Sequence, residues 1–252
     1  MKLIRKVIHF FNDDTPYYAA SLSFFTIFAI LPLLALLIVV ISNIPTISEY
    51  LDKIMLYIFD FINPTHSITL SKQIEKFLEN TSKLGYIGII YLIFVFTMFF
   101  KDYEYIINKI HQVNSRPMYK SFFLYLSFLF AIPLLIFIFI FLSTYSEISF
   151  FSTSIALLIT WFVFIILFIV SANTSISIKA SAVSSLITLV TLSITKTMFG
   201  YYVSANTTYA TIYGSFSVAL FFFLWIYISW NIYLYGTKLC SILNKDQLPN
   251  EN

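Results

Sequence analysis

A long uncharged segment near the C-terminal end constrains the fold of this chain more than any other feature. Thr211 to Gly236 is a run of 26 residues without Asp, Glu, Lys or Arg. At about 1.5 Å per residue, a helix of that length is roughly 39 Å long, enough to cross a hydrocarbon core about 30 Å thick. Trp225, Trp230 and several tyrosines supply amphipathic rings that suit the membrane interfaces. The segment therefore predicts a membrane-spanning helix.

The composition extends this prediction to the whole chain. Hydrophobic residues make up 59% of the sequence and charged residues 11%, against about a quarter in soluble domains. So few charges cannot cover a water-exposed surface, and lipid must be the solvent for most of it. The net charge of +3 is small and scattered, so we expect no nucleic-acid partner. The single cysteine, Cys240, excludes an intrachain disulfide and a cysteine-based metal cluster.

Five further apolar segments precede the first one along the chain. Together they predict an all-α, polytopic membrane protein in which residues 1–252 form a single membrane domain. We expect six transmembrane helices, at about 17–41, 85–100, 118–142, 154–170, 178–203 and 211–236. The second span is short, and its helical pattern continues into a cytosolic elbow.

Two more polar stretches have helical periodicity without the length of a span. Residues 2–11 alternate basic and apolar side chains, which predicts a short helix on the membrane surface; the alternative is a basic cytosolic tail. Residues 44–84, the first outside loop, repeat apolar residues at helical spacing. They predict two amphipathic helices, interrupted around Asn63-Pro64, lying over or beside the bundle.

The distribution of Lys and Arg predicts which side of the membrane each segment faces. With both termini in the cytoplasm, ten of the 15 Lys and Arg residues lie in inside segments. Four lie outside, all in the first outside loop, and Lys196 lies within the fifth span. Inside segments of membrane proteins carry an excess of Lys and Arg. This distribution predicts cytoplasmic N- and C-termini.

The C-terminal residues resemble a known family. Two blocks match its pattern in register: Phe199, Gly200, Tyr202, Val203, Tyr209, Ile212, Tyr213 and Gly214, then Leu224, Trp225, Tyr227, Ser229, Trp230, Leu234 and Gly236. Upstream, AASLSFFTIFAILPLL and Asn108-Lys109-Ile110-His111 are similar to its first span and to its elbow. The chain resembles the YihY/BrkB family of bacterial inner-membrane proteins, once described as ribonuclease BN. The resemblance implies a multi-pass protein of the inner membrane with a role in envelope integrity, virulence or lipid export.

Two positions depart from the family pattern. Thr237-Lys238 stands where the family usually has Ala-Glu, so a role assigned to that acid does not transfer to this chain. Ala172-Asn173-Thr174 stands where a Pro-Asn-basic turn is common, and it keeps only the Asn.

A charge inside a span is the main candidate for function, because such residues are costly and usually face protein or a water-lined path. Lys196 is that charge, and it matches a basic residue that is often found at this position in the family. The alternative is that Lys196 lies near the outer end of its span and extends to the head groups. The full set of candidate substrate-pathway residues is Lys196, Ser193, Thr197, Asn173, Asn206, Tyr209, Tyr213 and Gly214. Asparagines are more often capping or helix-pairing residues, and Gly214 also suits close packing or a turn.

Catalysis is the least favoured class of function. The three histidines lie on different segments, all twelve acids lie outside the predicted spans, and no catalytic or phosphate-binding motif occurs. A metal-dependent nuclease needs clustered carboxylates or histidines, so we expect no ribonuclease activity, no metal and no cofactor. The leading hypothesis is a transporter or translocator of an anionic lipid or envelope precursor, with membrane lipids as partners. The alternative is a membrane scaffold or envelope assembly factor that transports nothing.

The predicted topology has a direct test. Reporter fusions after residues 80, 115, 148, 175 and 207 should lie outside, inside, outside, inside and outside, because each reporter is separated from the next by one span. Alkaline phosphatase and green fluorescent protein activities of the fusions measure the two sides. A C-terminus accessible from outside the cell would contradict the topology.

Overall fold

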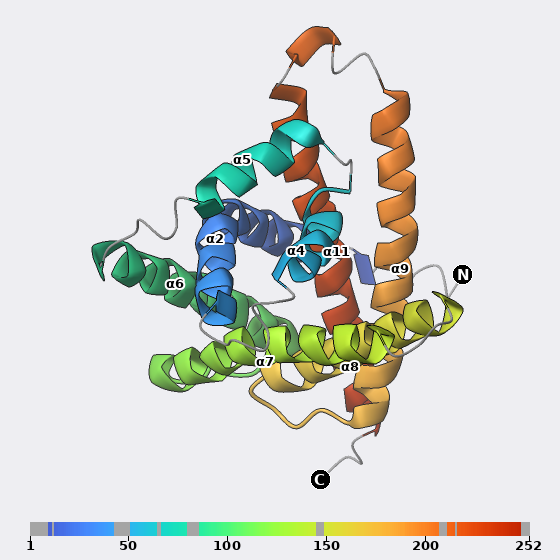
Figure 1. Ribbon diagram of the computed structural model, residues 1–252. Helices are drawn as coiled ribbons and strands as arrows, with labels where there is room; N and C mark the ends of the chain where they lie inside the picture. The colour runs from blue at the N-terminus through green and yellow to red at the C-terminus, as the bar shows by residue number, and fades with distance from the viewer. Residues whose placement is uncertain are drawn as a thin grey trace.

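The computed structural model describes residues 10–11, 13–42, 51–64, 67–79, 86–144, 149–206, 211–214 and 216–247. Within these ranges every regular element is a helix and no β-strand occurs. In Figure 1, α9 and α11 stand upright beside each other, while α7 and α8 run across the lower part of the molecule. The predicted all-α fold is confirmed.

Six helices are long. They contain 23 to 32 residues each: α2 (Thr15–Ser42), α6 (Tyr86–His111), α7 (Met118–Thr144), α8 (Ser149–Ser171), α9 (Ile178–Ala205) and α11 (Phe216–Gln247). Among the described residues, three stretches are both long and apolar enough to cross a membrane: Thr15–Ile38, Ile178–Ala205 and Phe216–Lys245. The chain is therefore a polytopic helical membrane protein. The count of six spans stays a prediction.

The last helix begins later than predicted. Residues 211–213 form one helical turn, and Gly214 follows with a φ of +53°. An α-helix of L-residues cannot continue through this left-handed conformation, which glycine adopts without steric cost. The last helix therefore begins at Phe216 instead of Thr211, and it continues to Gln247. The helical pattern that was predicted to continue beyond the second span is confirmed, since α6 is one helix that ends at His111.

The central packing joins α2, α6 and α11, with α9 and α8 added on the α11 side. The buried core contains members from all five helices, and aromatic rings fill much of it. Its largest members include Leu22, Phe96, Tyr103, Phe168 and Leu234.

Small hydroxylated residues allow α9 to approach α11 closely. Ser184 and Thr188 of α9 are buried, and each donates its hydroxyl to a carbonyl one turn earlier, over 2.7 Å. This internal bonding satisfies the hydroxyls where no water is present. Gly236 of α11 lies directly against Thr188, so a Cβ atom there would lie 1.9 Å from the Thr188 Oγ1 atom. The Thr188 side chain thus occupies the space that any side chain at position 236 would need.

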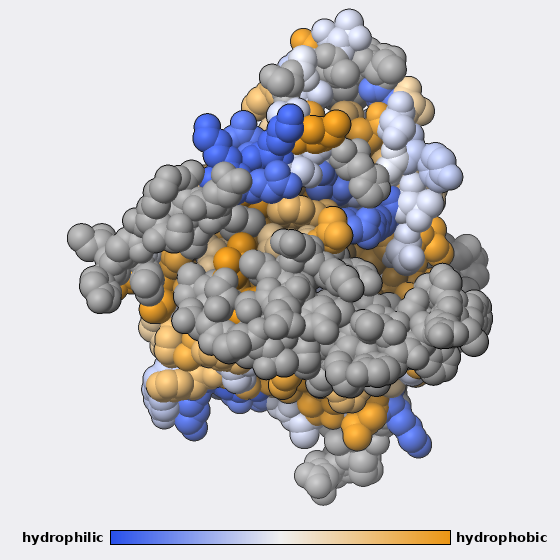
Figure 2. All heavy atoms as spheres, in the orientation of Figure 1, coloured by the Kyte–Doolittle hydropathy of each residue, from blue (hydrophilic) through white to orange (hydrophobic). Residues whose placement is uncertain are grey.

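The amphipathic helices predicted within residues 44–84 are confirmed as α4 (Leu51–Ile62) and α5 (Ile68–Glu79). The chain breaks between them at Asn63 and Pro64, as expected from the proline. Asn63 holds the break, because its side chain accepts from the Ser67 N–H over 3.0 Å and donates to the Ser67 carbonyl over 2.9 Å. Both helices pack against α2. Figure 2 shows hydrophilic side chains over α5, above the more hydrophobic middle of the molecule.

The predicted surface helix at residues 2–11 lies almost wholly outside the described residues. The described part begins with Phe10 and Phe11, which are helical and pack their rings against Tyr235 of α11.

The α9–α11 contact predicts a specific sensitivity. Gly236→Ala should lower the apparent melting temperature of the purified protein, because the added methyl group forces Thr188 and the two helices apart. Overpacking of this kind costs roughly 1–3 kcal/mol. Thermal unfolding in a mild detergent, monitored by circular dichroism, measures the loss.

Gly200→Ala is the matched control. A Cβ atom at Gly200 would meet the Pro64 carbonyl oxygen at 3.4 Å, an ordinary contact. This variant should melt within a degree or two of the parent, since changes without a clash or cavity usually shift stability by less than about 0.5 kcal/mol. Equal melting of both variants would show that the close approach of α9 and α11 does not limit stability.

Candidate functional site

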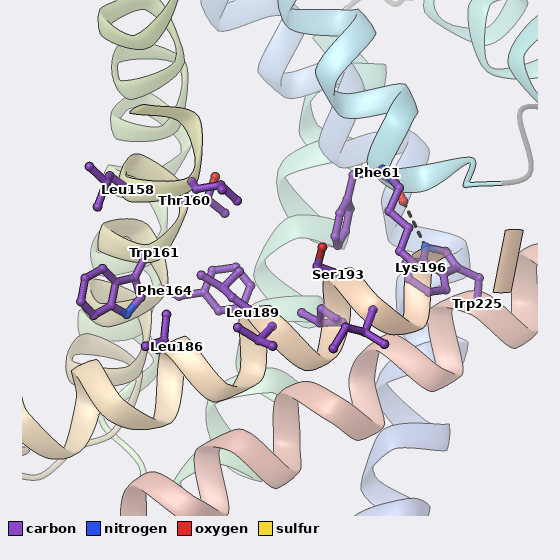
Figure 3. A pocket seen from close by; sticks show the side chains of 14 residues that line it. Phe61, Leu158, Thr160, Trp161, Phe164, Leu186, Leu189, Ser193, Lys196 and Trp225 are labelled. Carbon is purple, nitrogen blue, oxygen red and sulfur yellow. Dashed lines mark hydrogen bonds between the residues drawn. The ribbon is translucent and has the colours of Figure 1, made fainter. Parts of the chain in front are cut away.

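A cavity of about 600 Å³ lies between α8 and α9, and residues of α4 and α11 close one end of it. Figure 3 shows Trp161 of α8 at one end and Lys196 of α9, with Phe61 of α4, at the other. Most of the lining is apolar, and the polar groups include the hydroxyls of Thr160 and Ser193. Apolar chambers with a few placed polar groups are the usual form of small-molecule sites.

The charged end of the cavity is an ion pair. The Lys196 Nζ atom donates to the Asp60 Oδ2 atom of α4 over 2.6 Å, and the side chains are 30% and 55% exposed. A lysine at the bilayer centre costs roughly 2.5–3.5 kcal/mol, so a carboxylate within bonding distance removes much of that cost. Lys196 therefore lines a cavity and pairs with another helix.

Trp225 of α11 fixes α4 at this end. Its indole N–H donates to the Phe61 carbonyl over 3.0 Å, the bond that is dashed in Figure 3. Its ring also lies 5.5 Å from the ring of Phe199 on α9. Because Asp60 and Phe61 are neighbours in the chain, the same contact positions the carboxylate above Lys196.

Trp161 and the serines of α9 hold the other end. The Trp161 indole N–H donates to the Ala182 carbonyl and to the Ser185 Oγ atom, both over 3.1 Å. Ser181 donates to the Ile165 carbonyl over 2.9 Å. These bonds tie α8 to the first half of α9. Ser185 is thus a structural residue.

A second cavity of about 200 Å³ extends the first toward the bundle centre. The two share the lining residues Phe61, Phe164, Leu192 and Trp225. The second cavity adds Ser229, whose hydroxyl is buried and has no hydrogen-bond partner among the described residues. A buried hydroxyl usually has a hydrogen-bond partner, which here can be water or a polar group of a ligand.

An aromatic layer closes this cavity system. Tyr233 of α11 lines the second cavity and shares a hydrogen bond of 2.5 Å with Tyr103 of α6. Tyr103 also bonds to Ser171 of α8 over 2.8 Å. Around them, Trp230 packs against both tyrosines and Phe100 lies against Tyr103. The layer joins three helices across the path of the cavities.

Beyond the aromatic layer lies a polar network. Arg116, in the connection between α6 and α7, donates from its guanidinium to the Ser171 carbonyl over 3.3 Å and to the Ala172 carbonyl over 2.5 Å. Its backbone N–H donates to Glu104 of α6 over 2.9 Å. Asn108 accepts from the Asn173 N–H over 2.7 Å. The ends of α6 and α8 are therefore joined at this end of the bundle.

The start of α9 and the end of α11 lie at the same end. Asn244 of α11 accepts from the Ser177 N–H over 2.8 Å and donates to the Ser175 carbonyl over 3.0 Å. His111 is buried here, and burial together with the charge of Lys245 lowers its pKa to about 4. It is therefore neutral at physiological pH.

The structure brings two of the predicted pathway residues together. Lys196 and Ser193 line the cavity, whereas the exposed Thr197 donates its hydroxyl to the Ser193 carbonyl. Asn173 lies at the opposite end, where it donates to the Asn114 carbonyl over 2.8 Å. The remaining predicted residues belong to the connection between α9 and α11 or to its edge: Asn206 is the C-cap of α9, Tyr213 and Gly214 are exposed, and Tyr209 lies outside the described residues.

Several residues of the site were not predicted. Asp60 lies in a segment that the sequence predicts to be amphipathic, and nothing in that segment indicates a partner for its carboxylate. The missing signal was Lys196 itself, because an intramembrane charge needs a countercharge. Glu104 and Arg116 were assigned to a cytosolic elbow, yet Glu104 is 2% exposed. No local motif marks either pair, since each joins residues distant in sequence.

No group of three His, Cys, Asp or Glu side chains in the described part of the chain is placed to hold a metal ion. The cavity between α8 and α9 is an apolar chamber with one charged pair at its end. Its chemistry matches that of an amphiphile.

These features define a class: helical membrane proteins with a cavity against the lipid-facing helices. The family model for virulence factor BrkB matches residues 7–252. The chain therefore belongs to the BrkB family.

Similar proteins from other bacteria are also described as membrane proteins. A UPF0761 membrane protein of Aggregatibacter aphrophilus is 30% identical over 246 residues, covering 92% of this chain and 88% of the relative. One from Haemophilus influenzae is 30% identical over 239 residues, covering 90% and 89%. One from Legionella pneumophila is 28% identical over 253 residues, covering 94% of this chain and 61% of the relative. No solved structure matches the chain.

The two departures from the family pattern have structural counterparts. Lys238 donates to the Asp13 Oδ2 atom over 2.6 Å and to the Phe10 carbonyl, and its Nζ atom lies 4.7 Å from the centre of the Phe10 ring. This Lys238 contact fastens the segment before α2 to the end of α11. At the other departure, the turn at Ala172 has no basic residue of its own, and Arg116 binds its carbonyl.

The Lys238 contact predicts a pH-dependent tether. Burial alone would raise the pKa of Asp13, but hydrogen bonds from Lys238 and Thr15 lower it below its ordinary value. A lowered carboxyl pKa gives stability at neutral pH that is lost as the pH falls through it. Lys238→Met should therefore lower the apparent melting temperature, and it should do so more at pH 7 than at pH 3.

Lys238→Arg is the control, because it keeps the charge and the donors and should melt close to the parent at pH 7. Equal effects of Lys238→Met at both pH values would show that the Asp13 pair adds nothing to stability.

Proposed function

We propose that this protein binds an anionic amphiphile, a lipid or lipid-linked envelope precursor, and moves it within the bacterial inner membrane. The cavity between α8 and α9 would hold the apolar chains, and Lys196 would bind the head group. The single observation that carries the proposal is the Lys196 ammonium group at the end of an apolar cavity of about 600 Å³.

Access from the bilayer supports this assignment. Leu157 and Leu158 of α8 line the cavity and are 64% and 58% exposed, and Val190 and Ile194 of α9 are 50% and 56% exposed. In a membrane these side chains contact lipid tails. A lipid would enter sideways without leaving the hydrocarbon phase, so its chains would pay little desolvation cost.

Asp60 occupies the position that an anionic head group would take. In the free protein its carboxylate neutralises Lys196 at 2.6 Å. An incoming phosphate would exchange with this carboxylate, and the half-exposed Asp60 side chain would turn to water. The exchange keeps the lysine paired at each stage, which avoids an isolated charge in a medium of low polarity.

Movement beyond the cavity would require the aromatic layer to open. The layer of Tyr103, Tyr233 and Ser171 separates the cavities from the polar end of the bundle. In the proposal this layer is the gate, and its hydrogen bonds close the path when no substrate is bound. The proposal includes no catalytic step.

The test is a charge cycle at the pair. Lys196→Met should weaken binding of a fluorescent phosphatidylglycerol about tenfold or more, because it removes the positive partner of the phosphate. A tenfold change in affinity corresponds to about 1.4 kcal/mol of binding free energy. Asp60→Asn should strengthen binding by a similar factor, because it removes the competing carboxylate. Lys196→Arg should keep part of the affinity. Fluorescence titration in nanodiscs of neutral lipid measures the binding constants.

Lys179→Met is the matched control, since Lys179 is an exposed lysine of the same helix that does not line the cavity. It should bind like the parent. Equal binding by the Lys196→Met, Asp60→Asn and parent proteins would remove the pair from the mechanism. Translocation is measured separately, by dithionite quenching of labelled lipid in proteoliposomes. Binding that depends on Lys196 without any translocation would contradict the transport half of the proposal and favour a lipid-binding scaffold.

A further inference from the structure

A third cavity lies at the opposite end of the bundle, between α6 and α7. Its volume is about 170 Å³. The residues that line it come from the middle of α6, between Phe96 and Tyr105, and from the first turns of α7 with the residues just before it. It shares no lining residue with the cavity at Lys196.

Glu104 presents an unsatisfied oxygen at this cavity. Its side chain is 2% exposed, and its Oε1 atom accepts from the Arg116 N–H and lies 3.7 Å from the Arg116 guanidinium. The Oε2 atom is buried and has no hydrogen-bond partner within the described part of the chain. Buried carboxylate oxygens are nearly always bonded, so this atom indicates that a donor is missing.

Positive charge exceeds negative charge around the same cavity. Lys101 and Arg116 contribute two positive charges, Glu104 contributes one negative charge, and the sum is +1. Arg116 is committed to the Ser171 and Ala172 carbonyls, whereas the exposed Lys101 makes no hydrogen bond among the described residues. The charge of Lys101 acts on its chain neighbour Asp102, which does not line the cavity. The N-terminus of α7, at Met118, adds its positive dipole end.

The remaining wall is apolar. Phe96 and Phe100 of α6 and Met118 and Phe122 of α7 line it. These residues lie where the predicted second span ends and the third begins, so the cavity has a wet side and a lipid side. A ligand that fits both sides is an amphiphile with a compact polar head.

We infer that this cavity binds the head group of an anionic phospholipid that carries hydroxyl groups, of the phosphatidylglycerol type. The phosphate lies near Lys101 and the start of α7, and a head-group hydroxyl donates to the Glu104 Oε2 atom. The negative phosphate brings the summed charge from +1 to zero, which a zwitterionic head group does not. By the predicted topology this end is cytoplasmic, so the lipid belongs to the inner leaflet. The site is independent of Lys196.

The experiment compares three lipids on the full-length protein. Phosphatidylglycerol carries the charge and the hydroxyls, phosphatidylmethanol the same charge without hydroxyls, and phosphatidylethanolamine no net charge. Native mass spectrometry of protein released from nanodiscs with equal amounts of the three measures the lipid retained. The parent should retain phosphatidylglycerol several-fold over each of the others.

Two variants separate the contributions. Lys101→Gln should lower phosphatidylglycerol retention about tenfold, because it removes a positive partner of the phosphate. Glu104→Gln should reduce the preference over phosphatidylmethanol, because a neutral hydrogen bond between the amide and a head-group hydroxyl is weaker than the charge-assisted bond to the carboxylate. Lys120→Gln is the matched control, since Lys120 is an exposed lysine at the same end that does not line the cavity. Melting temperatures establish that each variant is folded.

Equal retention by the Lys101→Gln and Lys120→Gln proteins would overturn the inference. So would equal retention of phosphatidylglycerol and phosphatidylmethanol by the parent. Competition by millimolar glycerol 3-phosphate as effective as that of the lipid would assign the site to a soluble phosphate instead. The same comparison is made in the Lys196→Met background, where the other proposed lipid site is weakened. The preference for phosphatidylglycerol and its loss on Lys101→Gln should persist there, so that failure of this site and failure of the Lys196 site are distinguishable.

Discussion

The close approach of α9 to α11 is the contact on which the rest of the structure depends. Gly236 has no side chain where Thr188 lies, and the serines of α9 bond to their own helix or to α8. In lipid, where apolar surface gives no drive for helices to associate, such small and self-satisfied contacts are what allow packing. Once α9 is fixed on α11, Trp161 joins α8 to it and Trp225 supports α4. The cavity is the space left between these anchored helices.

The placement of charge follows from the same medium. Of the ion pairs in the described residues, one joins Lys196 to Asp60 and another joins Arg116 to Glu104. Each pair borders a cavity, and the two lie at opposite ends of the bundle. Between them stand an aromatic layer and neutral hydrogen bonds among Tyr103, Tyr233 and Ser171. A protein that handles amphiphiles needs polar groups at two membrane surfaces and a closed apolar middle, and this arrangement supplies them with few charges.

The amphipathic helix α4 takes part in the site. Asp60 and Phe61 at the end of α4 complete the cavity, and the break at Asn63 and Pro64 brings the chain against Gly200 of α9. A helix that rests on the bundle through a few contacts can move more easily than one packed in its core. In the proposed function, α4 is therefore the element that carries the exchanging carboxylate.

The sequence by itself determined the class of the protein. The uncharged run at 211–236, the scarcity of charge and the periodicity of residues 44–84 required lipid-facing helices and two amphipathic ones, because each is a local property of the chain. The family followed from the residues around Gly200 and Trp225, and Lys196 was identified because a charge in a span is rare.

Only the tertiary structure decided what those residues contact. Asp60 lies 136 positions from Lys196, and Arg116 meets Ala172 across 56. No periodicity encodes such pairings. Asn173 and Asn206 were named for their polarity, but Asn173 joins loops at one end and Asn206 caps a helix at the other. Polarity shows that a side chain needs a partner, but the partner is set by how the helices pack.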